Sequence, residues 1–272
     1  MYRNRHITVI IPALNEEPSI AKVIDGLFNL QVCNHCTQLI NSDCNGAAIS
    51  LVDTVIVGDN GSTDETAAIS KACGAMVMDA PELGYGAACL AALAAPVEKD
   101  IIVFVDGDHS VTPNELPSLL NPIIDGADLV IGSRTLGDCE KGALSIPQVL
   151  GNKLAIVLMR LMWGGTITDL GPFRASTQEA LNAIGMRDKK FGWTVEMQIR
   201  AMQLSLTTVE VPVSTKVRIG KSKIGGTVKG VVAAGHGILG TIGKLYWRQI
   251  TGKYKKVSAE SSSTKPSGQL PS

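Results

Sequence analysis

Residues 101–108 read Ile-Ile-Val-Phe-Val-Asp-Gly-Asp, and much of the architecture of the chain follows from them. The apolar run 101–105 is typical of a strand buried on both faces, as strands of parallel sheets are. Asp106 and Asp108 follow at its carboxyl end, which is the edge where open α/β sheets bind ligands. Carboxylate oxygens are hard ligands that suit Mg²⁺ or Mn²⁺. The segment therefore predicts a divalent cation held against a diphosphate.

Strand and helix patterns alternate around this segment. We expect strands at 7–12, 52–57, 75–78 and 129–131, and helices at 15–30, up to residue 72 and from Gly84 onward. Such alternation predicts an α/β fold with a mainly parallel sheet and flanking helices.

After residue 132 the alternation weakens. Helices are expected at 151–162, 191–202 and 225–247, and an edge strand at 207–213. We therefore expect three parts in the chain. They are a main domain at 1–225 with an inserted loop at 33–48, a basic amphipathic helical segment at 226–256 and a disordered tail at 257–272.

Charge is unevenly distributed along the 272 residues, although the net charge is zero. Residues 211–259 contain no Asp or Glu, whereas they hold ten Lys and Arg. Such a basic end attracts phosphate, an acidic membrane surface or nucleic acid. Nucleic acid is the least favoured of these partners, because no recognised nucleic-acid-binding motif accompanies the basic residues. The chain shows no run of about 18 apolar residues that would span a membrane.

The six cysteines are expected to be reduced thiols, because the N-terminus shows no signal peptide. Cys33, Cys36 and Cys44 lie close together in the sequence, with His35 between the first two. A zinc site there is an alternative, but a matching second ligand pair is missing. We favour a loop without metal.

Seven motifs in one order resemble the family 2 glycosyltransferases, which have the GT-A fold. The most similar members are the polyprenyl-phosphate sugar transferases of the dolichyl-phosphate mannose and glucose synthase type. The resemblance covers about residues 6 to 225 and rests on residues 12–16, 59–64, 84–88, 106–108, 132–134, 169–174 and 218–223.

The resemblance implies a nucleotide-sugar site. Nucleoside contacts would come from Pro12, Ala13, Asn15 and Glu16. Asp59 would accept a hydrogen bond from the base, although Asp also commonly caps turns. Gly84 and Gly86 would let the backbone approach the nucleotide or sugar, or would serve only the helix entry.

The resemblance also implies a metal site and phosphate contacts. Asp106 and Asp108 would hold the metal, with Asp108 the more direct ligand. Arg218, Ser222 and Lys223 would close over the donor phosphates. Ser110 stands where the family often carries Gln, so a contact from a side-chain amide is not expected at this position.

The acceptor side would be formed by other residues. Arg134 and Lys153 would face an acceptor phosphate. Asp169 and Glu196 are the remaining carboxylate candidates for catalysis. A lipid phosphate acceptor would need no strong base, whereas a hydroxyl acceptor would require one of these two.

The resulting interpretation is a metal-dependent, inverting hexosyltransferase that uses UDP-glucose or GDP-mannose, with UDP-glucose favoured. Its acceptor would be a polyprenyl or dolichyl phosphate, and the protein would be cytoplasmic and peripheral on the membrane. Alternatives are a soluble acceptor such as phosphoglycerate or a saccharide, a nucleotidyltransferase, and a non-catalytic nucleotide-binding protein. The oligomeric state is left open.

Overall fold

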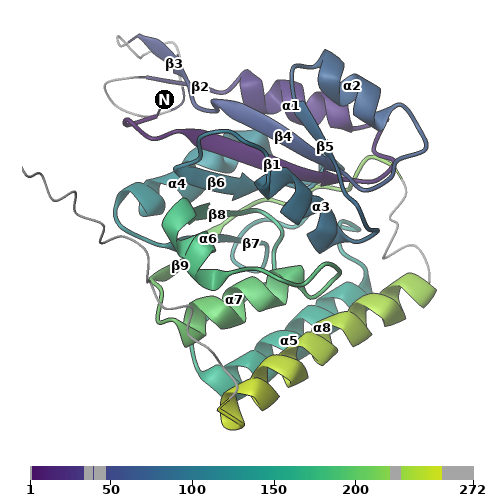
Figure 1. Ribbon diagram of the computed structural model, residues 1–272, viewed down its shortest axis with the longest axis vertical. Coiled ribbons are helices and arrows are strands. Elements are labelled where there is room, and N and C mark those ends of the chain that lie inside the picture. Colours follow the sequence, from purple (N-terminus) through teal and green to yellow (C-terminus); the bar gives the residue numbers. More distant parts are fainter. Residues whose placement is uncertain (1, 34–38, 40–46, 221–227, 253–272) are drawn as a thin grey trace, which may run out of the picture.

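The computed structural model describes residues 2–33, 39, 47–220 and 228–252. Its centre is a seven-stranded sheet with the order β5-β4-β1-β6-β8-β7-β9 (Figure 1). The strands are β1 (Ile7–Ala13), β4 (Thr54–Asp59), β5 (Met76–Asp79), β6 (Ile101–Phe104), β7 (Leu129–Ser133), β8 (Arg174–Thr177) and β9 (Thr208–Pro212).

All strands of this sheet except β8 run in the same direction. The pairs β1–β4, β1–β6, β4–β5 and β7–β9 are parallel, whereas β8 is antiparallel to both β6 and β7. The predicted mainly parallel α/β sheet is confirmed, and β9 is an edge strand. β8 was not expected, because its sequence Arg-Ala-Ser-Thr has no apolar run.

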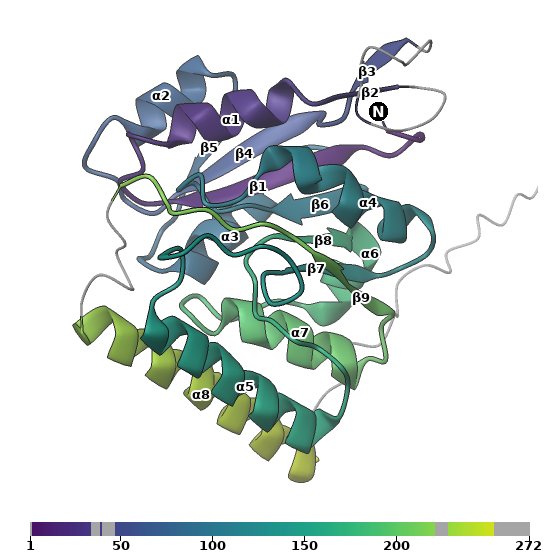
Figure 2. The same cartoon turned by 180° about the vertical axis from the view of Figure 1, so that it is seen from behind.

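Helices cover both faces of the sheet (Figures 1 and 2). One face carries α1 (Ile20–Phe28), α2 (Thr66–Ala72) and α4 (Leu116–Ile124), the last preceded by the short helix η1 (Pro113–Glu115). The other carries α3 (Tyr85–Leu93), α6 (Gln178–Ile184) and α7 (Trp193–Gln203). The pair α5 (Ile146–Trp163) and α8 (Val228–Ile250) packs against the outer side of α7. Successive residues of a strand face opposite sides, so Val9 and Ile11 join one core and Ile10 the other.

Several boundaries differ from the predictions. α5 begins at Ile146 rather than 151, because the amide of Ser145 donates to Gln148 Oε1 (2.9 Å) in a capping box that starts the helix earlier. The ends of the predicted loop 33–48 belong to an antiparallel ribbon of β2 (Gln31–Cys33) and β3 (Ala48–Ser50). The predicted tail at 257–272 lies outside the described residues.

The direction of the strands sets the position of the site. β1, β4, β6 and β7 all end at one edge of the sheet, at Ala13, Asp59, Phe104 and Ser133. Residues 106–108 follow β6 at the middle of that edge. Within the described part of the chain, no helix is long and apolar enough to cross a membrane.

Candidate active site

Two cavities open at this edge of the sheet and meet at three residues. The first has a volume of about 430 Å³ and the second about 330 Å³. Asp106, Asp108 and Arg218 line both. A ligand in one cavity would therefore touch the same charged groups as a ligand in the other.

The first cavity lies between the end of β1 and the start of α3. Its wall includes Pro12, Ala13, Leu14, Glu16, Asn60, Leu83, Gly84, Tyr85, Ala88, Lys190 and Phe191. Asn60 fixes the 82–84 segment, since its Nδ2 donates to the Glu82 carbonyl (3.0 Å) and its Oδ1 accepts from the Gly84 amide (2.8 Å). The resulting wall is preformed and mostly apolar, which is typical of small-molecule sites.

Asn15 and Asp59 lie next to this wall rather than on it. Asn15 Oδ1 accepts from the Thr63 amide (2.7 Å), which ties the end of β1 to the turn after β4. Asp59 is buried; its Oδ2 accepts from the Ser62 amide (3.1 Å), and its Oδ1 has no hydrogen-bond partner among the described residues. Buried acceptors are usually satisfied, so this oxygen suits a ligand N–H group.

The two glycines of the α3 entry have a packing role in the structure. A Cβ on Gly84 would lie 2.0 Å from the Lys189 carbonyl oxygen, and a Cβ on Gly86 would lie 2.0 Å from that of Asp188. The backbone approach that glycine permits here is therefore to the 188–190 loop. Gly84 also lines the first cavity, because that loop and the α3 entry form its far wall.

Asp106 and Asp108 carry the main electrostatic feature of the site. Burial of the carboxyl group and the neighbouring charge of Asp108 raise the pKa of Asp106 to about 7. Tyr85 donates from its hydroxyl to Asp106 Oδ1 (3.0 Å), which favours the charged form. Asp108 Oδ1 accepts from the Ser110 amide (2.9 Å). Two close carboxylates of this kind fit a divalent cation, which would relieve their repulsion.

Arg218 lies across the junction of the cavities. Its guanidinium is 2.9 Å from Asp108 Oδ2 and 3.4 Å from Glu16 Oε1. The predicted partners Ser222 and Lys223 lie outside the described residues, so the structure assigns no position to them.

The second cavity is assembled from distant parts of the chain. Its wall includes Ser110, Val111, Gly132, Arg134, Gly142, Ala143, Leu144, Ser145, Gln148, Pro172, Phe173, Val213, Thr215 and Val217. Arg134 is its cationic side chain apart from the shared Arg218. Asp106 and Asp108 also line it, so Arg134 and Arg218 are the side chains there that could contact an anionic group.

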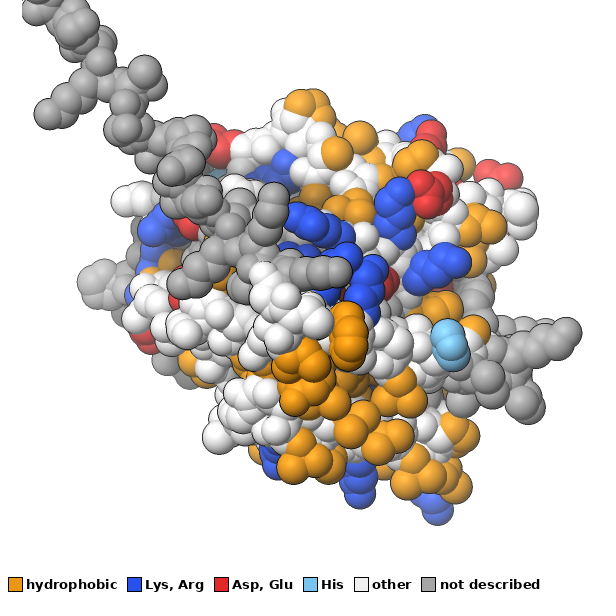
Figure 3. Space-filling view, turned by 60° about the horizontal axis from the view of Figure 1, so that its bottom comes forward, with side chains coloured by type: hydrophobic (Ala, Val, Ile, Leu, Met, Phe, Trp, Pro, Cys, Tyr) orange, Lys and Arg blue, Asp and Glu red, His pale blue; other side chains and the backbone are white. Residues whose placement is uncertain are grey.

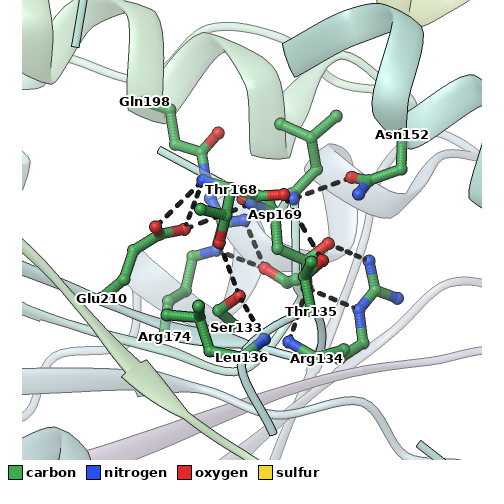
Figure 4. Close-up of polar contacts among 12 residues, drawn as sticks. Ser133, Arg134, Thr135, Leu136, Asn152, Thr168, Asp169, Arg174, Gln198 and Glu210 are labelled. Carbon is green, nitrogen blue, oxygen red and sulfur yellow. Dashed lines mark hydrogen bonds and ion pairs between the residues drawn. The ribbon is translucent and has the colours of Figure 1, made fainter. Parts of the chain in front are cut away.

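Asp169 holds Arg134 in place (Figure 4). Its Oδ2 accepts from Arg134 Nε (2.8 Å) and from the Arg134 amide (2.9 Å), and its Oδ1 accepts from Nη2 (2.8 Å). Burial alone would raise the pKa of Asp169, but these hydrogen bonds outweigh it and lower the pKa. Asp169 is therefore a charged partner of Arg134 and does not line either cavity.

The backbone around Asp169 is held equally firmly (Figure 4). Glu210 accepts from the amides of Thr168 (2.9 Å) and Asp169 (3.2 Å), and Asn152 accepts from the amide of Leu170 (2.9 Å). Gln198 donates to the Asp169 carbonyl (2.9 Å). Side chains from β9, α5 and α7 thus fix the loop that orients Arg134.

Glu196 faces away from both cavities. Its Oε2 accepts from the amides of Arg187 (2.9 Å) and Asp188 (2.6 Å), and its Oε1 lies 3.0 Å from Arg200 Nε. This carboxylate therefore fixes the 187–190 loop, which packs on the α3 entry.

Other predicted residues lie away from the site or outside the described residues. Lys153 is exposed on α5 and lines neither cavity. Cys33 is buried at the end of β2, and Cys36 and Cys44 lie outside the described residues. In the described ranges no group of three or more His, Cys, Asp or Glu could hold a metal ion.

Tyr85, Asn60, Gln148 and Thr215 were not expected at the site. Asn60 and Tyr85 lie inside the motifs 59–64 and 84–88, so their position next to predicted site residues could have indicated them. Nothing in the sequence pattern indicates that 142–148 and 213–217 come together.

Comparisons with known proteins show which family the chain resembles. The model of the family described as "Glycosyl transferase family 2" matches residues 8–185. An uncharacterized glycosyltransferase of Mycobacterium tuberculosis is 32% identical over 231 residues, which is 84% of this chain and 94% of the relative. A dolichyl-phosphate hexose transferase of Haloferax volcanii is 32% identical over 172 residues, 62% of this chain and 73% of the relative.

A solved structure has a similar fold. Glucosyl-3-phosphoglycerate synthase of Mycobacterium tuberculosis, in complex with Mn²⁺, UDP-glucose and phosphoglyceric acid, superposes with a TM-score of 0.68 at 25% identity. The match covers 90% of this chain and 81% of that chain. The same synthase has also been solved with Mg²⁺ and UDP.

Proposed function

The chain belongs to glycosyl transferase family 2, and on that basis we propose that it transfers a hexose from a nucleotide-diphosphate sugar to a polyprenyl or dolichyl phosphate. The observation that carries this proposal is the pair of cavities that share Asp106, Asp108 and Arg218. One cavity would hold the donor, the other would hold the acceptor phosphate, and the bond exchange would occur at the junction.

The first cavity would hold the nucleotide. Pro12, Ala13 and Glu16 would contact the nucleoside, and the free Oδ1 of Asp59 would accept from the base. Arg218 would turn onto the diphosphate, together with Ser222 and Lys223. UDP-glucose is the favoured donor, and the UDP-glucose complex of the similar synthase supports this choice.

Asp106 and Asp108 would hold Mg²⁺ or Mn²⁺. Burial and the neighbouring charge of Asp108 raise the pKa of Asp106, and a bound cation would offset both effects. Structures of the similar synthase contain Mn²⁺ or Mg²⁺. Bound there, the ion would offset the negative charge that grows on the leaving diphosphate.

The transfer would be a single displacement with inversion. An oxygen of the acceptor phosphate would attack the anomeric carbon, and the bond to the diphosphate would break with its electron pair leaving on the diphosphate. Arg134, which Asp169 orients, would hold the attacking phosphate. Arg218 would stabilise the departing charge.

The positions of the candidate bases support a phosphate acceptor. Asp169 is engaged by Arg134, and Glu196 is engaged by the 187–188 amides and Arg200. Neither lines a cavity, so neither is placed to deprotonate a hydroxyl. An acceptor that is already anionic needs no such base. The dolichyl-phosphate hexose transferase among the relatives supports a lipid acceptor.

A soluble phosphorylated acceptor is the second candidate, because the similar synthase was solved with phosphoglyceric acid. The test is a matrix of two donors, UDP-glucose and GDP-mannose, against two acceptors, a detergent-dispersed polyprenyl phosphate and phosphoglycerate. Metal-dependent transfer to the polyprenyl phosphate, with an inverted anomeric centre, is expected. Transfer to phosphoglycerate alone would support the second candidate, and nucleotide binding without transfer or hydrolysis would identify a non-catalytic binding protein.

A further inference from the structure

The outer surface of α5 is apolar although it faces away from the core. Five of its side chains are between 48% and 78% exposed: Ile146, Leu150, Leu154, Val157 and Leu161. At about 100° per residue they form one stripe about 80° wide. The opposite side of the helix, with Ala155 and Met159, packs into the core. Exposed apolar stripes of this length mark interaction surfaces.

α8 extends this surface. It lies beside α5 in both ribbon views (Figures 1 and 2) and exposes Leu239, Trp247 and Ile250. The rings of Trp163 and Tyr246 contact edge to face at 5.8 Å, and the Trp163 indole also donates to Gln249, so the ends of the two helices are joined. We call this outer surface of the two helices the α5–α8 face. Figure 3 shows hydrophobic side chains gathered there.

The charged side chains that belong to α5 and α8 themselves have one sign. Neither residues 141–168 nor residues 228–250 include Asp or Glu. Lys153 and Arg160 lie on one flank of the α5 stripe, and Lys244 is exposed on α8. An apolar stripe with basic flanks is the composition of helices that lie in the interface of a membrane.

We propose that the α5–α8 face docks on an anionic lipid bilayer, with both helices parallel to the membrane plane. The exposed leucines and Trp247 would enter the boundary between headgroups and acyl chains, while the lysines would pair with acidic headgroups. A second copy of the chain is disfavoured as the occupant. Facing copies would bring basic side chains together without a carboxylate on either face to neutralise them.

The face adjoins the second cavity. Ser145 and Gln148 line that cavity, and Ile146 and Leu150 begin the apolar stripe one turn apart on the same helix. This step rests on the proposed function: if a lipid phosphate binds in the second cavity, its hydrocarbon chain would lie next to the bilayer. The docking itself requires no substrate, and it can be measured alone.

Flotation of the full chain with lipid vesicles tests the docking. We expect it to float with vesicles that contain phosphatidylglycerol and much less with phosphatidylcholine alone. L150S combined with L161S removes two exposed side chains that make little internal packing, and we expect an affinity at least about tenfold lower. The control M76S changes an exposed apolar residue on β5, at the other end of the sheet, and is expected to bind like the wild type.

Charge is tested separately. K153Q and K244Q should each lower binding about fivefold at low salt, with less effect as salt rises. Equal flotation of the wild type and L150S/L161S, with unchanged melting, would overturn the proposal. So would a wild-type dimer that L150S/L161S dissociates while neither binds vesicles. Transfer to a detergent-dispersed acceptor is measured in parallel, so failure of docking is distinguishable from failure of the proposed function.

Discussion

The two cavities that meet at Asp106 and Asp108 are built differently. Much of the first cavity, which we propose holds the donor, comes from the ends of strands and the turns after them, with residues 12–16 at the end of β1 and 106–108 after β6. The second cavity, which we propose holds the acceptor, is lined by residues of the segments 142–148, 172–173 and 213–218. These segments come together only in the folded protein. Short local motifs are visible in a sequence, whereas a wall made of distant loops is not. Variants on each side should therefore separate the two substrates.

The largest effect is expected at the junction. Asp108→Asn removes a charge that both cavities share, so turnover should fall by about 10²- to 10³-fold, as when other preorganised electrostatic groups are lost. Steady-state kinetics with and without a chelator measures the loss. Asp79→Asn, an exposed carboxylate at the end of β5, is the matched control. Near-normal turnover of Asp108→Asn would exclude it as a metal ligand.

On the acceptor side, Arg134→Lys keeps the positive charge. It loses the planar guanidinium, whose Nε and Nη2 bind Asp169 and so hold the side chain at the second cavity. We expect the KM for the acceptor phosphate to rise about tenfold or more, with donor affinity unchanged. A parallel loss of donor affinity would show that Arg134 does not act on the acceptor alone.

The pairing of Asp169 with Arg134 beside the second cavity can be tested through the pH dependence of stability. The pKa of Asp169 is lowered in the folded protein, so its pairing with Arg134 stabilises the fold above the usual Asp pKa and is lost as pH falls through the lowered value. Asp169→Asn should therefore be less stable at neutral pH, and the gap in melting temperature should narrow in acid. A constant gap across pH would contradict an ionised Asp169.

On the donor side, Asp59→Ala should weaken binding of the nucleoside diphosphate by about tenfold, because one hydrogen bond to a charged acceptor is lost. Calorimetry measures the affinity, and the KM for the acceptor should not change. Unchanged donor affinity would show that Asp59 only stabilises its turn by accepting a hydrogen bond from the Ser62 amide.

The smallest effect on turnover is expected from Glu196→Gln. The amide can still accept from the 187–188 backbone, so the donor KM should rise by less than about tenfold while thermal stability drops as the Arg200 pair is lost. A pH–rate profile decides the role. If the acidic limb of the wild-type profile, where activity falls as a base becomes protonated, disappears in the variant, Glu196 is a general base after all.

The sequence predicts the sheet because it rests on local patterns, and several residues that the structure brings together in the first cavity likewise lie in short local motifs. The apolar runs at 7–12, 52–57 and 101–105 match β1, β4 and β6 within a few residues. The same runs predict which edge carries Asp106 and Asp108, since parallel strands end together.

What the sequence does not predict depends on tertiary contacts. β8 has no apolar run, and its place between β6 and β7 is set by pairing on both sides. Asp169 and Glu196 are acidic residues that the sequence alone allows as catalytic groups. Only the fold shows that Asp169 binds Arg134 and that Glu196 accepts hydrogen bonds from two backbone amides. Lys153 is exposed on α5 and lines neither cavity, and its place in the sequence does not indicate which face of the helix it occupies.

The contact between Arg218 and Asp108 has a consequence for the order in which ligands bind. A bare cation must compete with the guanidinium for the Asp108 carboxylate, which lies 2.9 Å away. A diphosphate that arrives with the cation gives Arg218 new oxygens at the same moment, so the exchange leaves no charge unpaired. Metal and nucleotide should therefore bind with positive cooperativity, each raising the affinity for the other by the same factor.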